Sequence, residues 1–260
     1  TLKLTQHGLM DTTLPPDEAA AQVMHNGLFL NNGDGSFSEI AWMAGVAASD
    51  WTWSTKFVDV DLDGYLDLLI NNAGVASADK MEVEPIAQWR WVMEINVFGI
   101  VNMCQQFIPV FKQQGYGSIL NVASQAGLTP IPFMSSYNAS KAAVVSLSET
   151  LRLELASDNI NISVLCPGFF KTNLGSSLRT QLPTMEKLLG KLFDKSPINA
   201  EQVAEIAYQG ESNKQFLLLT HQQGKRLYLL KRLLPRNLYF TLVLAQTRRL
   251  RQLLGNEQTQ

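Results

Sequence analysis

The sequence SILNVASQAGLTPIPFMSSYNASK, residues 118–141, decides how the rest of the chain is organised. It begins with a short apolar strand at 118–122, continues through a loop rich in Ser, Gly and Pro, and enters a helix near Met134. Tyr137 and Lys141 are four residues apart, so on a helix they lie on one face, one turn apart. The stretch therefore predicts a strand–loop–helix unit that holds a phenol and an ammonium group close together.

Three side chains of this stretch can carry out proton chemistry, namely Ser124, Tyr137 and Lys141. A phenol normally loses its proton near pH ~10, and a neighbouring ammonium lowers that pKa because it favours the phenolate. Such a tyrosine can exchange a proton with a substrate oxygen near neutral pH, while Ser124 donates a hydrogen bond to the same oxygen. The alternative is an amphipathic helix that carries a Tyr and a Lys by chance, because such pairs are common on helices.

Further motifs occur in order on both sides of this stretch. An apolar run ends in an Asn-Asn-Ala-Gly sequence, an Asn lies in a segment of helical periodicity, and a second apolar run ends in Pro-Gly. In this order and spacing they resemble the short-chain dehydrogenase/reductase family, over about residues 66–220 with a tail to 254. The motifs are Asn71-Asn72-Ala73-Gly74, Asn96, Ser124, Tyr137 with Lys141, Pro167-Gly168 and Thr172.

The resemblance implies a role for each of these residues. Tyr137 would be the catalytic acid/base, Lys141 would lower its pKa and hold the nicotinamide ribose, and Ser124 would orient the carbonyl. Asn96 would position a water in the proton relay. The implied cofactor is NAD or NADP and the implied substrate a small-molecule carbonyl/alcohol pair. The residues implied to bind the cofactor are Asn71, Ala73, Gly74, Tyr137, Lys141, Pro167, Gly168 and Thr172.

Apolar runs alternate with segments of helical periodicity, which indicates parallel βαβ units. We expect an α/β fold, a partial Rossmann-like parallel sheet with flanking helices, preceded by a small β-hairpin segment. Since ligands bind at the carboxyl ends of parallel strands, Asn71, Ser124 and Pro167-Gly168 are expected to share one cleft. Strands are predicted at 66–70, 118–122, 161–166 and 215–220, and helices at 85–113, 134–156 and 200–209.

Residues 27–70 follow a different pattern. The sequence GLFLNNGDGSFSEIA predicts a β-hairpin, because Asn-Gly and Asp-Gly accept positive φ. The sequence FVDVDLDGYLD then spaces Asp59, Asp61, Asp63 and Asp67 so that their oxygens can bind one Ca²⁺, although Ile70 stands where an EF-hand requires Glu. The alternative is an acidic, solvated turn. The segment resembles one FG-GAP/VCBS β-propeller repeat.

The two resemblances meet at residues 66–70. The first strand and the Gly-rich turn that hold the cofactor pyrophosphate in a dehydrogenase are not found in the first seventy residues. We therefore expect a fusion of a propeller-like segment, 1–65, and a dehydrogenase-like domain, 66–260, with weakened cofactor binding. The alternative function is a non-enzymatic fusion, a calcium-binding or interaction module on an inactive dehydrogenase scaffold.

The lid and the C-terminal tail both leave alternatives open. Residues 175–200 contain many Leu, which indicates either an apolar substrate or a lid helix that packs on the core. Residues 225–254 are basic and amphipathic, and charges interrupt them too often for a membrane span. This tail is predicted to lie on an anionic membrane surface, to dock on a partner subunit, or to pack on its own domain.

Charge and cysteine usage limit partners and location. The net charge of −2 argues against a nucleic-acid partner. Cys104 and Cys166 are predicted to be buried free thiols, which suits a cytoplasmic location, with membrane association as the variant that the tail allows. The long helices at 85–113 and 134–156 match those that form dimer interfaces in the family, so a homo-oligomer is expected.

Overall fold

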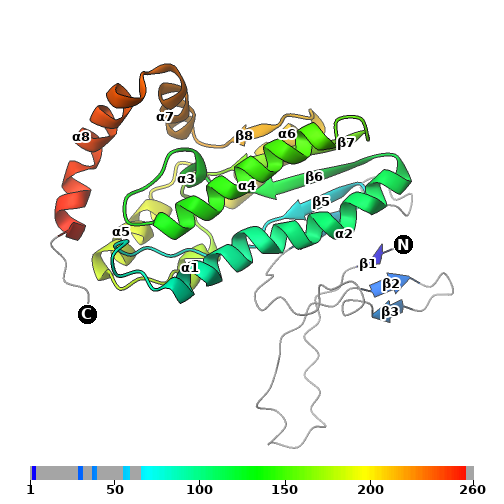
Figure 1. Ribbon diagram of the computed structural model, residues 1–260, viewed down its shortest axis with the longest axis horizontal. Helices are drawn as coiled ribbons and strands as arrows, with labels where there is room; N and C mark the ends of the chain where they lie inside the picture. Colours follow the sequence, from blue (N-terminus) through cyan, green and yellow to red (C-terminus); the bar gives the residue numbers. More distant parts are fainter. Residues whose placement is uncertain (1, 4–28, 32–36, 40–54, 59–65, 256–260) are drawn as a thin grey trace, which may run out of the picture.

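The computed structural model describes residues 2–3, 29–31, 37–39, 55–58 and 66–255. Its main part is a five-stranded sheet with helices on both faces (Figure 1), which confirms the predicted α/β fold. The strand order is β4-β5-β6-β7-β8, and β5 to β8 run parallel. The strands are β4 (Thr55–Val58), β5 (Leu68–Asn71), β6 (Gly117–Val122), β7 (Ile160–Cys166) and β8 (Leu217–Leu219).

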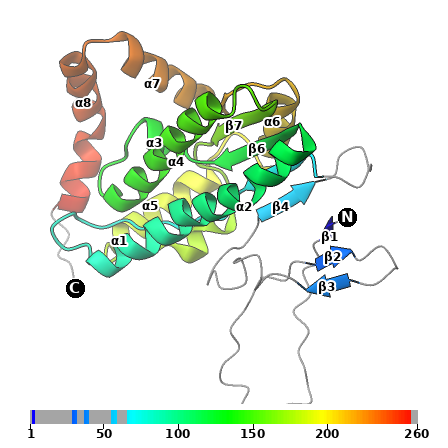
Figure 2. The ribbon, with the colours of Figure 1, turned by 45° about the vertical axis from the view of Figure 1, so that its right-hand side comes forward.

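The strand β4 lies at the edge of this sheet and runs against its neighbour (Figure 2). It pairs antiparallel with β5, with Thr55 opposite Asn71 and Val58 opposite Leu68. The chain therefore enters β4 at the end of the sheet where the parallel strands finish, and it leaves β4 at the end where they begin. A short antiparallel strand thus occupies the place next to β5.

The two faces of the sheet are covered by different helices. One face packs against α2 (Gly99–Gln114) and α4 (Ser135–Glu154), and the other packs against α6 (Ala200–Ser212). Alternate strand residues divide between the faces, because successive side chains of a strand point to opposite sides. Leu69, Ile119, Ile162 and Val164 meet Phe107, Phe111 and Val144 on the first face, whereas Leu120 and Leu165 meet Val203 and Ala207 on the second.

The predicted helix at 85–113 is divided into three parts. The helix α1 (Ile86–Met93) leads into a π-helix, η2 (Glu94–Phe98), and α2 then continues to Gln114. The prediction of one uniform helix is wrong at this point, because the wider turn carries Asn96 inward to bond with Val75. The helix ends at Gly115, whose φ of 85° is the left-handed conformation that favours glycine.

The remaining helices surround the end of the sheet at which the parallel strands finish. Every helix in the described part of the chain is too short or too polar to span a bilayer. The remaining elements are α3 (Gln125–Leu128), the 3-10 helix η3 (Asn173–Ser177), α5 (Pro183–Asp194), α7 (Gln222–Leu233) and α8 (Arg236–Gly255).

A second, three-stranded sheet comprises β1 (Leu2–Lys3), β2 (Phe29–Asn31) and β3 (Phe37–Glu39). The strands β2 and β3 pair antiparallel, as the hairpin prediction requires. Asp59, Asp61 and Asp63 of the predicted calcium loop lie outside the described residues.

Candidate active site

A large cavity of about 1120 Å³ opens at the edge where β5, β6 and β7 end. Three of the four predicted catalytic residues line it, namely Ser124, Tyr137 and Lys141. They come from a loop and from α4, and the residues that follow β5 and β7 complete the wall. Of the residues predicted to share one cleft, Ser124, Pro167 and Gly168 line this cavity and Asn71 does not. The predicted cofactor residues that also line the cavity are Ala73, Gly74, Pro167, Gly168 and Thr172.

The position of Ser124 follows from the close approach of two elements. Ser124 begins α3, and its hydroxyl accepts a hydrogen bond from the Ala126 N–H at 3.1 Å. A Cβ added at Gly127 would lie 2.6 Å from the carbonyl carbon of Lys141, so only glycine lets α3 pack this closely on α4. The loop therefore holds the Ser124 hydroxyl close enough to Tyr137 for the two side chains to share a hydrogen bond.

Tyr137 is buried within an apolar cluster that includes Met134, Leu182 and Met185. Burial raises the pKa of Tyr137 above its usual value because it disfavours the phenolate, and the hydrogen bond from Ser124 opposes this only in part. The predicted lowering of this pKa by Lys141 is therefore wrong in direction. The Lys141 Nζ atom lies 6.0 Å from the centre of the Tyr137 ring, and desolvation is the largest influence on the Tyr137 pKa.

The Lys141 ammonium is buried beneath the loop that follows β5. Its Nζ donates a hydrogen bond to the Val122 carbonyl at 3.0 Å. Burial lowers the pKa of Lys141 from 10.5 to about 8. A Cβ added at Gly74 would lie 3.2 Å from Nζ, so the glycine leaves room for the ammonium at the cavity wall. Lys141 can therefore release or take up a proton close to neutral pH.

The side chain of Asn96 holds the loop after β5. Its Oδ1 accepts from the Val75 N–H at 2.8 Å, and its Nδ2 donates to the Val75 carbonyl at 3.0 Å and to Ser140 Oγ at 2.9 Å. Asn96 is fully buried and does not line the cavity. Its side chain fixes Val75, next to Gly74, against α4, and the predicted contact with a water stays a prediction.

Asn71 also does not line the cavity. Its Nδ2 donates to Asn121 Oδ1 at 2.8 Å, and Asn121 in turn donates to Ser148 Oγ at 3.0 Å. Asn71 and Asn121 are opposite each other in the parallel register of β5 and β6, so both amides point into the core. The described contacts of Asn71 are thus structural, and its contact with a cofactor stays a prediction.

Sequence reasoning missed a buried group at the start of α4. Both Ser77 and Ser136 donate hydrogen bonds to Oε1 of Glu84, and the distance from Ser77 is 2.8 Å. Ser136 immediately precedes Tyr137, so this carboxylate anchors the first turn of α4. Its negative charge also lies near a helix N-terminus, where the helix dipole favours it. The only sequence signal is a Glu before a Pro.

His221 is a second residue that sequence reasoning missed. The Gly168 N–H donates to its Nδ1 at 3.1 Å, so this nitrogen carries no proton, and its Nε2 lies 2.9 Å from the Phe169 carbonyl, to which it donates. Burial lowers the pKa of His221, which agrees with a neutral ring. This histidine therefore fixes the loop after β7 that lines the cavity. The sequence feature that could have indicated His221 is its position just after the last apolar strand.

The apolar wall of the cavity comes from the lid and from α8. Of the two alternatives for residues 175–200, the lid helix that packs on the core agrees with the structure. Leu182, Met185 and Leu189 are buried in the same cluster as Tyr137. The contribution of α8 was not predicted. Its lining residues are Tyr239, Val243, Gln246, Thr247 and Leu250.

The residues around the cavity fit one half of a nicotinamide dinucleotide. Gly74, Ser124, Tyr137 and Lys141 line the cavity together, and their hydroxyl, phenol and ammonium groups can form hydrogen bonds with a nicotinamide ribose. The pyrophosphate half is different. A phosphate-binding turn follows the carboxyl end of the first strand of such a fold. The carboxyl end of β4 instead lies at the opposite end of the sheet, where the parallel strands begin. In the described part of the chain no element offers the pyrophosphate this cradle.

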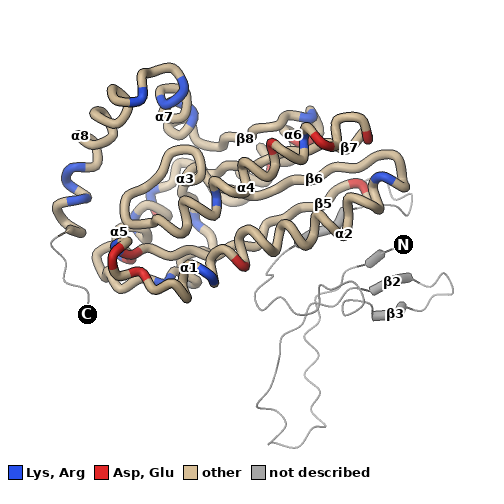
Figure 3. Tube along the Cα trace, viewed as in Figure 1, with Lys and Arg blue, Asp and Glu red and all other residues tan. Residues whose placement is uncertain are grey.

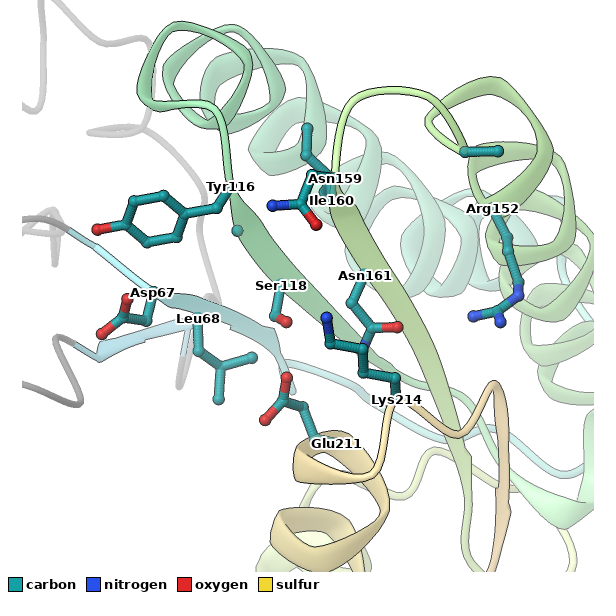
Figure 4. Close-up of a pocket in the computed structure, with 12 residues that line it drawn as sticks. Asp67, Leu68, Tyr116, Ser118, Arg152, Asn159, Ile160, Asn161, Glu211 and Lys214 are labelled. Atoms are coloured by element: carbon teal, nitrogen blue, oxygen red, sulfur yellow. The ribbon is translucent and has the colours of Figure 1, made fainter.

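A second cavity of about 470 Å³ lies at the opposite edge, where the parallel strands begin (Figure 4). Asp67 lines it and therefore lies at the other end of β5 from Ser124, Tyr137 and Lys141. The cavity combines both signs of charge, from Asp67, Arg152, Glu211 and Lys214. Among the described residues no group of three or more His, Cys, Asp or Glu could hold a metal ion.

Fold and site together describe an α/β protein in which Ser124, Tyr137 and Lys141 meet at one cavity, at the carboxyl ends of the parallel strands. The family model described as short chain dehydrogenase matches residues 45–183. The chain belongs to the short-chain dehydrogenase family, a family of oxidoreductases. A model of an FG-GAP-like repeat matches residues 16–70, so the two matches share residues 45–70.

Individual relatives agree with this membership. The chain is 33% identical over 187 residues to a D-beta-hydroxybutyrate dehydrogenase from Rhizobium meliloti, covering 70% of this chain and 69% of that protein. It is 34% identical over 178 residues to a CLA biosynthesis dehydrogenase/reductase from Lactiplantibacillus plantarum, covering 62% of each. A crystal structure of a Burkholderia phymatum short-chain dehydrogenase/reductase in complex with NAD superposes with a TM-score of 0.61, at 31% identity, covering 65% of this chain and 66% of that one. The chain thus spans about two thirds of the length of these proteins.

Proposed function

We propose that this protein is an NAD(P)-dependent oxidoreductase that interconverts a carbonyl and an alcohol, with Tyr137 as its acid/base. The convergence of Ser124, Tyr137 and Lys141 at one cavity carries the proposal. Hydride transfer is the chemistry that the nicotinamide supplies when bound. Gly74, Tyr137 and Lys141 would hold its ribose, with Pro167, Gly168 and Thr172 beside the ring.

The protein groups handle the proton at the substrate oxygen. The raised pKa of Tyr137 keeps its phenol protonated at neutral pH, so it donates a proton to a carbonyl oxygen. Ser124 donates a hydrogen bond to that oxygen and stabilises the charge that develops on it. Lys141, with a pKa of about 8, would then supply the proton that replaces the one given up by Tyr137 and would take another from solvent. At neutral pH the phenol is therefore in the protonated form that carbonyl reduction requires.

The substrate is proposed to be apolar. The cavity wall beyond Tyr137 is formed by Leu178, Leu189, Leu192, Phe193 and Leu250. An apolar chain gains about 25 cal/mol for each Å² that it buries against such side chains. Ser124 and Tyr137 place two hydroxyl groups beside this apolar wall, so a carbonyl or alcohol group on an apolar body fits the cavity.

A comparison of two cofactors tests the proposal. Because only the nicotinamide half has a described site, NADH and reduced nicotinamide mononucleotide are expected to bind with similar dissociation constants. Nicotinamide fluorescence would be titrated with NADH, NADPH and the mononucleotide. NADH that binds far more tightly than the mononucleotide would show that the chain provides a pyrophosphate site after all. Absence of saturable binding at millimolar cofactor would remove the proposed function.

Variants identify the site of binding and of proton transfer. Tyr137→Phe with Lys141→Ala is expected to abolish saturable binding and any carbonyl reduction. Tyr208→Phe, on the exposed surface of α6, is the matched control for loss of a phenol. Equal activity of Tyr137→Phe and Tyr208→Phe would contradict the assignment of the acid/base.

The edge position of β4 favours a second candidate function, a non-enzymatic fusion with a calcium-binding or interaction module. A strand that fills the sheet edge stabilises the fold without contributing to cofactor binding. The proposed Ca²⁺ ligands are Asp59, Asp61, Asp63 and Asp67. A rise in melting temperature with Ca²⁺ that is lost in Asp61→Ala, without any binding of NADH, would favour this candidate. Assembly into a homo-oligomer stays a prediction.

A further inference from the structure

We propose that α7 and α8 form a docking surface for an anionic lipid bilayer, with the mouth of the cavity facing the lipid. The surface is defined by residues 222–255, the two helices and their connection. Docking itself does not depend on the proposed reaction, whereas the supply of an apolar substrate from the bilayer rests on the proposed function.

The charge of this surface has one sign. Residues 225–251 carry eight Lys and Arg, and residues 212–256 contain no Asp or Glu. Along α7 and α8, Figure 3 marks positions of Lys and Arg but none of Asp or Glu, whereas positions of Asp and Glu lie on α6 and near α1 and α5. A second copy docked symmetrically on this surface would bring like charges together. The attraction between acidic lipids and a protein contributes about 1 kcal/mol for each Lys or Arg near the membrane surface.

The same surface exposes an unusual share of large apolar side chains. Of fifteen such side chains exposed on the described residues, eight belong to α7 and α8. Exposed apolar groups combined with basic residues are typical of helices that lie in the membrane interface. Nucleic acid would match the charge but not these side chains. They are Leu229, Leu230, Leu233, Leu238, Phe240, Leu242, Leu244 and Leu253.

The exposed apolar residues of α8 border the cavity. Tyr239 and Val243, one turn apart, line the cavity. Leu238 and Leu242 lie along one side of this line, and Phe240 with Leu244 along the other, as the 3.6-residue period requires. The apolar lining therefore continues outward onto both flanks of the helix. A bilayer that covers these flanks would join its hydrocarbon to the apolar end of the cavity.

Vesicle sedimentation tests the charge part of the proposal. The full chain is expected to sediment with vesicles of phosphatidylcholine and phosphatidylserine but not with phosphatidylcholine alone, and high salt should release it. Neutralising two exposed cations in Arg248→Gln with Arg249→Gln should weaken binding roughly 30-fold. Lys214→Gln, at the far cavity, is the matched control and should bind as the unchanged chain does.

A fluorescent label tests the apolar part and the orientation. Cys104 and Cys166 are buried, so a new surface cysteine is the site that a thiol-reactive, environment-sensitive dye labels first. Dye at Leu242→Cys should shift to the blue with anionic vesicles. Dye at Leu153→Cys should not, although Leu153 on α4 is even more exposed, at 80% against 50%.

Three outcomes would overturn the proposal. The first is vesicle binding of equal strength with and without phosphatidylserine, or with and without Arg248 and Arg249. The second is an equal blue shift at positions 242 and 153. The third is a dimer in solution that Leu242→Ser dissociates, because a second copy would then cover the surface. None of these measurements uses a nicotinamide cofactor, so failure of docking and failure of the proposed reaction are distinguishable.

Discussion

Replacing the buried ammonium of Lys141 by an apolar side chain is predicted to make the protein more stable at neutral pH. The substitution Lys141→Met keeps most of the volume and removes a charge from a site that is only 3% exposed. The native state lowers the pKa of Lys141 from 10.5 to about 8, so it holds the charged form at a cost that the unfolded chain does not have.

The magnitude follows from the size of this change. Each pKa unit corresponds to about 1.4 kcal/mol, so the charged form costs the native state about 3 kcal/mol at pH 7. The variant also loses the hydrogen bond from Nζ to the Val122 carbonyl, which contributes about 1 kcal/mol. Lys141→Met is therefore expected to raise the free energy of unfolding by about 2 kcal/mol while it abolishes the proposed binding of the cofactor.

The difference in stability between the variant and the unchanged chain should depend on pH in a defined direction. Between about pH 8 and 10.5 the unfolded lysine still holds its proton and the native one has lost it, so the contribution of Lys141 to stability rises with pH. The advantage of the variant should then shrink across this interval. Other titrating groups largely cancel when variant and unchanged chain are compared at the same pH.

Urea unfolding curves recorded at pH 7, 8, 9 and 10 would measure the difference. Lys187→Met, at an exposed position of α5, is the control and should show no such trend. A variant that is less stable than the unchanged chain at pH 7, or a difference that is constant with pH, would refute the reasoning.

Two further predictions concern packing and the buried thiols. Gly127→Ala should lower the melting temperature and any reductase activity, because its Cβ would lie 2.6 Å from Lys141 backbone atoms, whereas Gly190→Ala, with open space around it in α5, should be neutral or stabilising. Burial raises the pKa of Cys104 and of Cys166 to about 12, so the unfolded thiols ionise first and stability should fall as pH rises above about 9. Unfolding curves from pH 8 to 10 should show a shallower fall when both cysteines are replaced by Ala, and an unchanged slope would contradict this origin.

Much of the fold could be predicted from the sequence because its elements carry their own signals. The apolar run before Asn71 and the run that includes Ser163 and Val164 form β5 and β7, close to their predicted limits. The antiparallel course of β4 carries no such signal, because an edge strand is held by main-chain hydrogen bonds that do not depend on side-chain identity. The π-turn at Asn96 likewise depends on a bond to Val75, distant in the sequence.

The site was predicted less completely than the fold. Residue identities place Tyr137 beside Lys141, but the direction of the Tyr137 pKa depends on burial, which follows from the packing of Met134, Leu182 and Met185 around the ring. The motif that contains Asn71 does not indicate which way its side chain points. Asn71 lies two residues after Leu69 and so shares its face of β5, which turns the amide into the core.

Residues 59–67 are all that separates β4 from β5 in the sequence, whereas the parallel strand that a dehydrogenase places beside β5 needs a long crossover. A local pair closes a short loop and loses little chain entropy, so it can form early in folding, before distant segments meet. The outer boundary of a sheet is consequently a point where evolution can exchange one segment for an unrelated one and keep a foldable chain, while the chemistry that depended on the exchanged segment must be supplied anew.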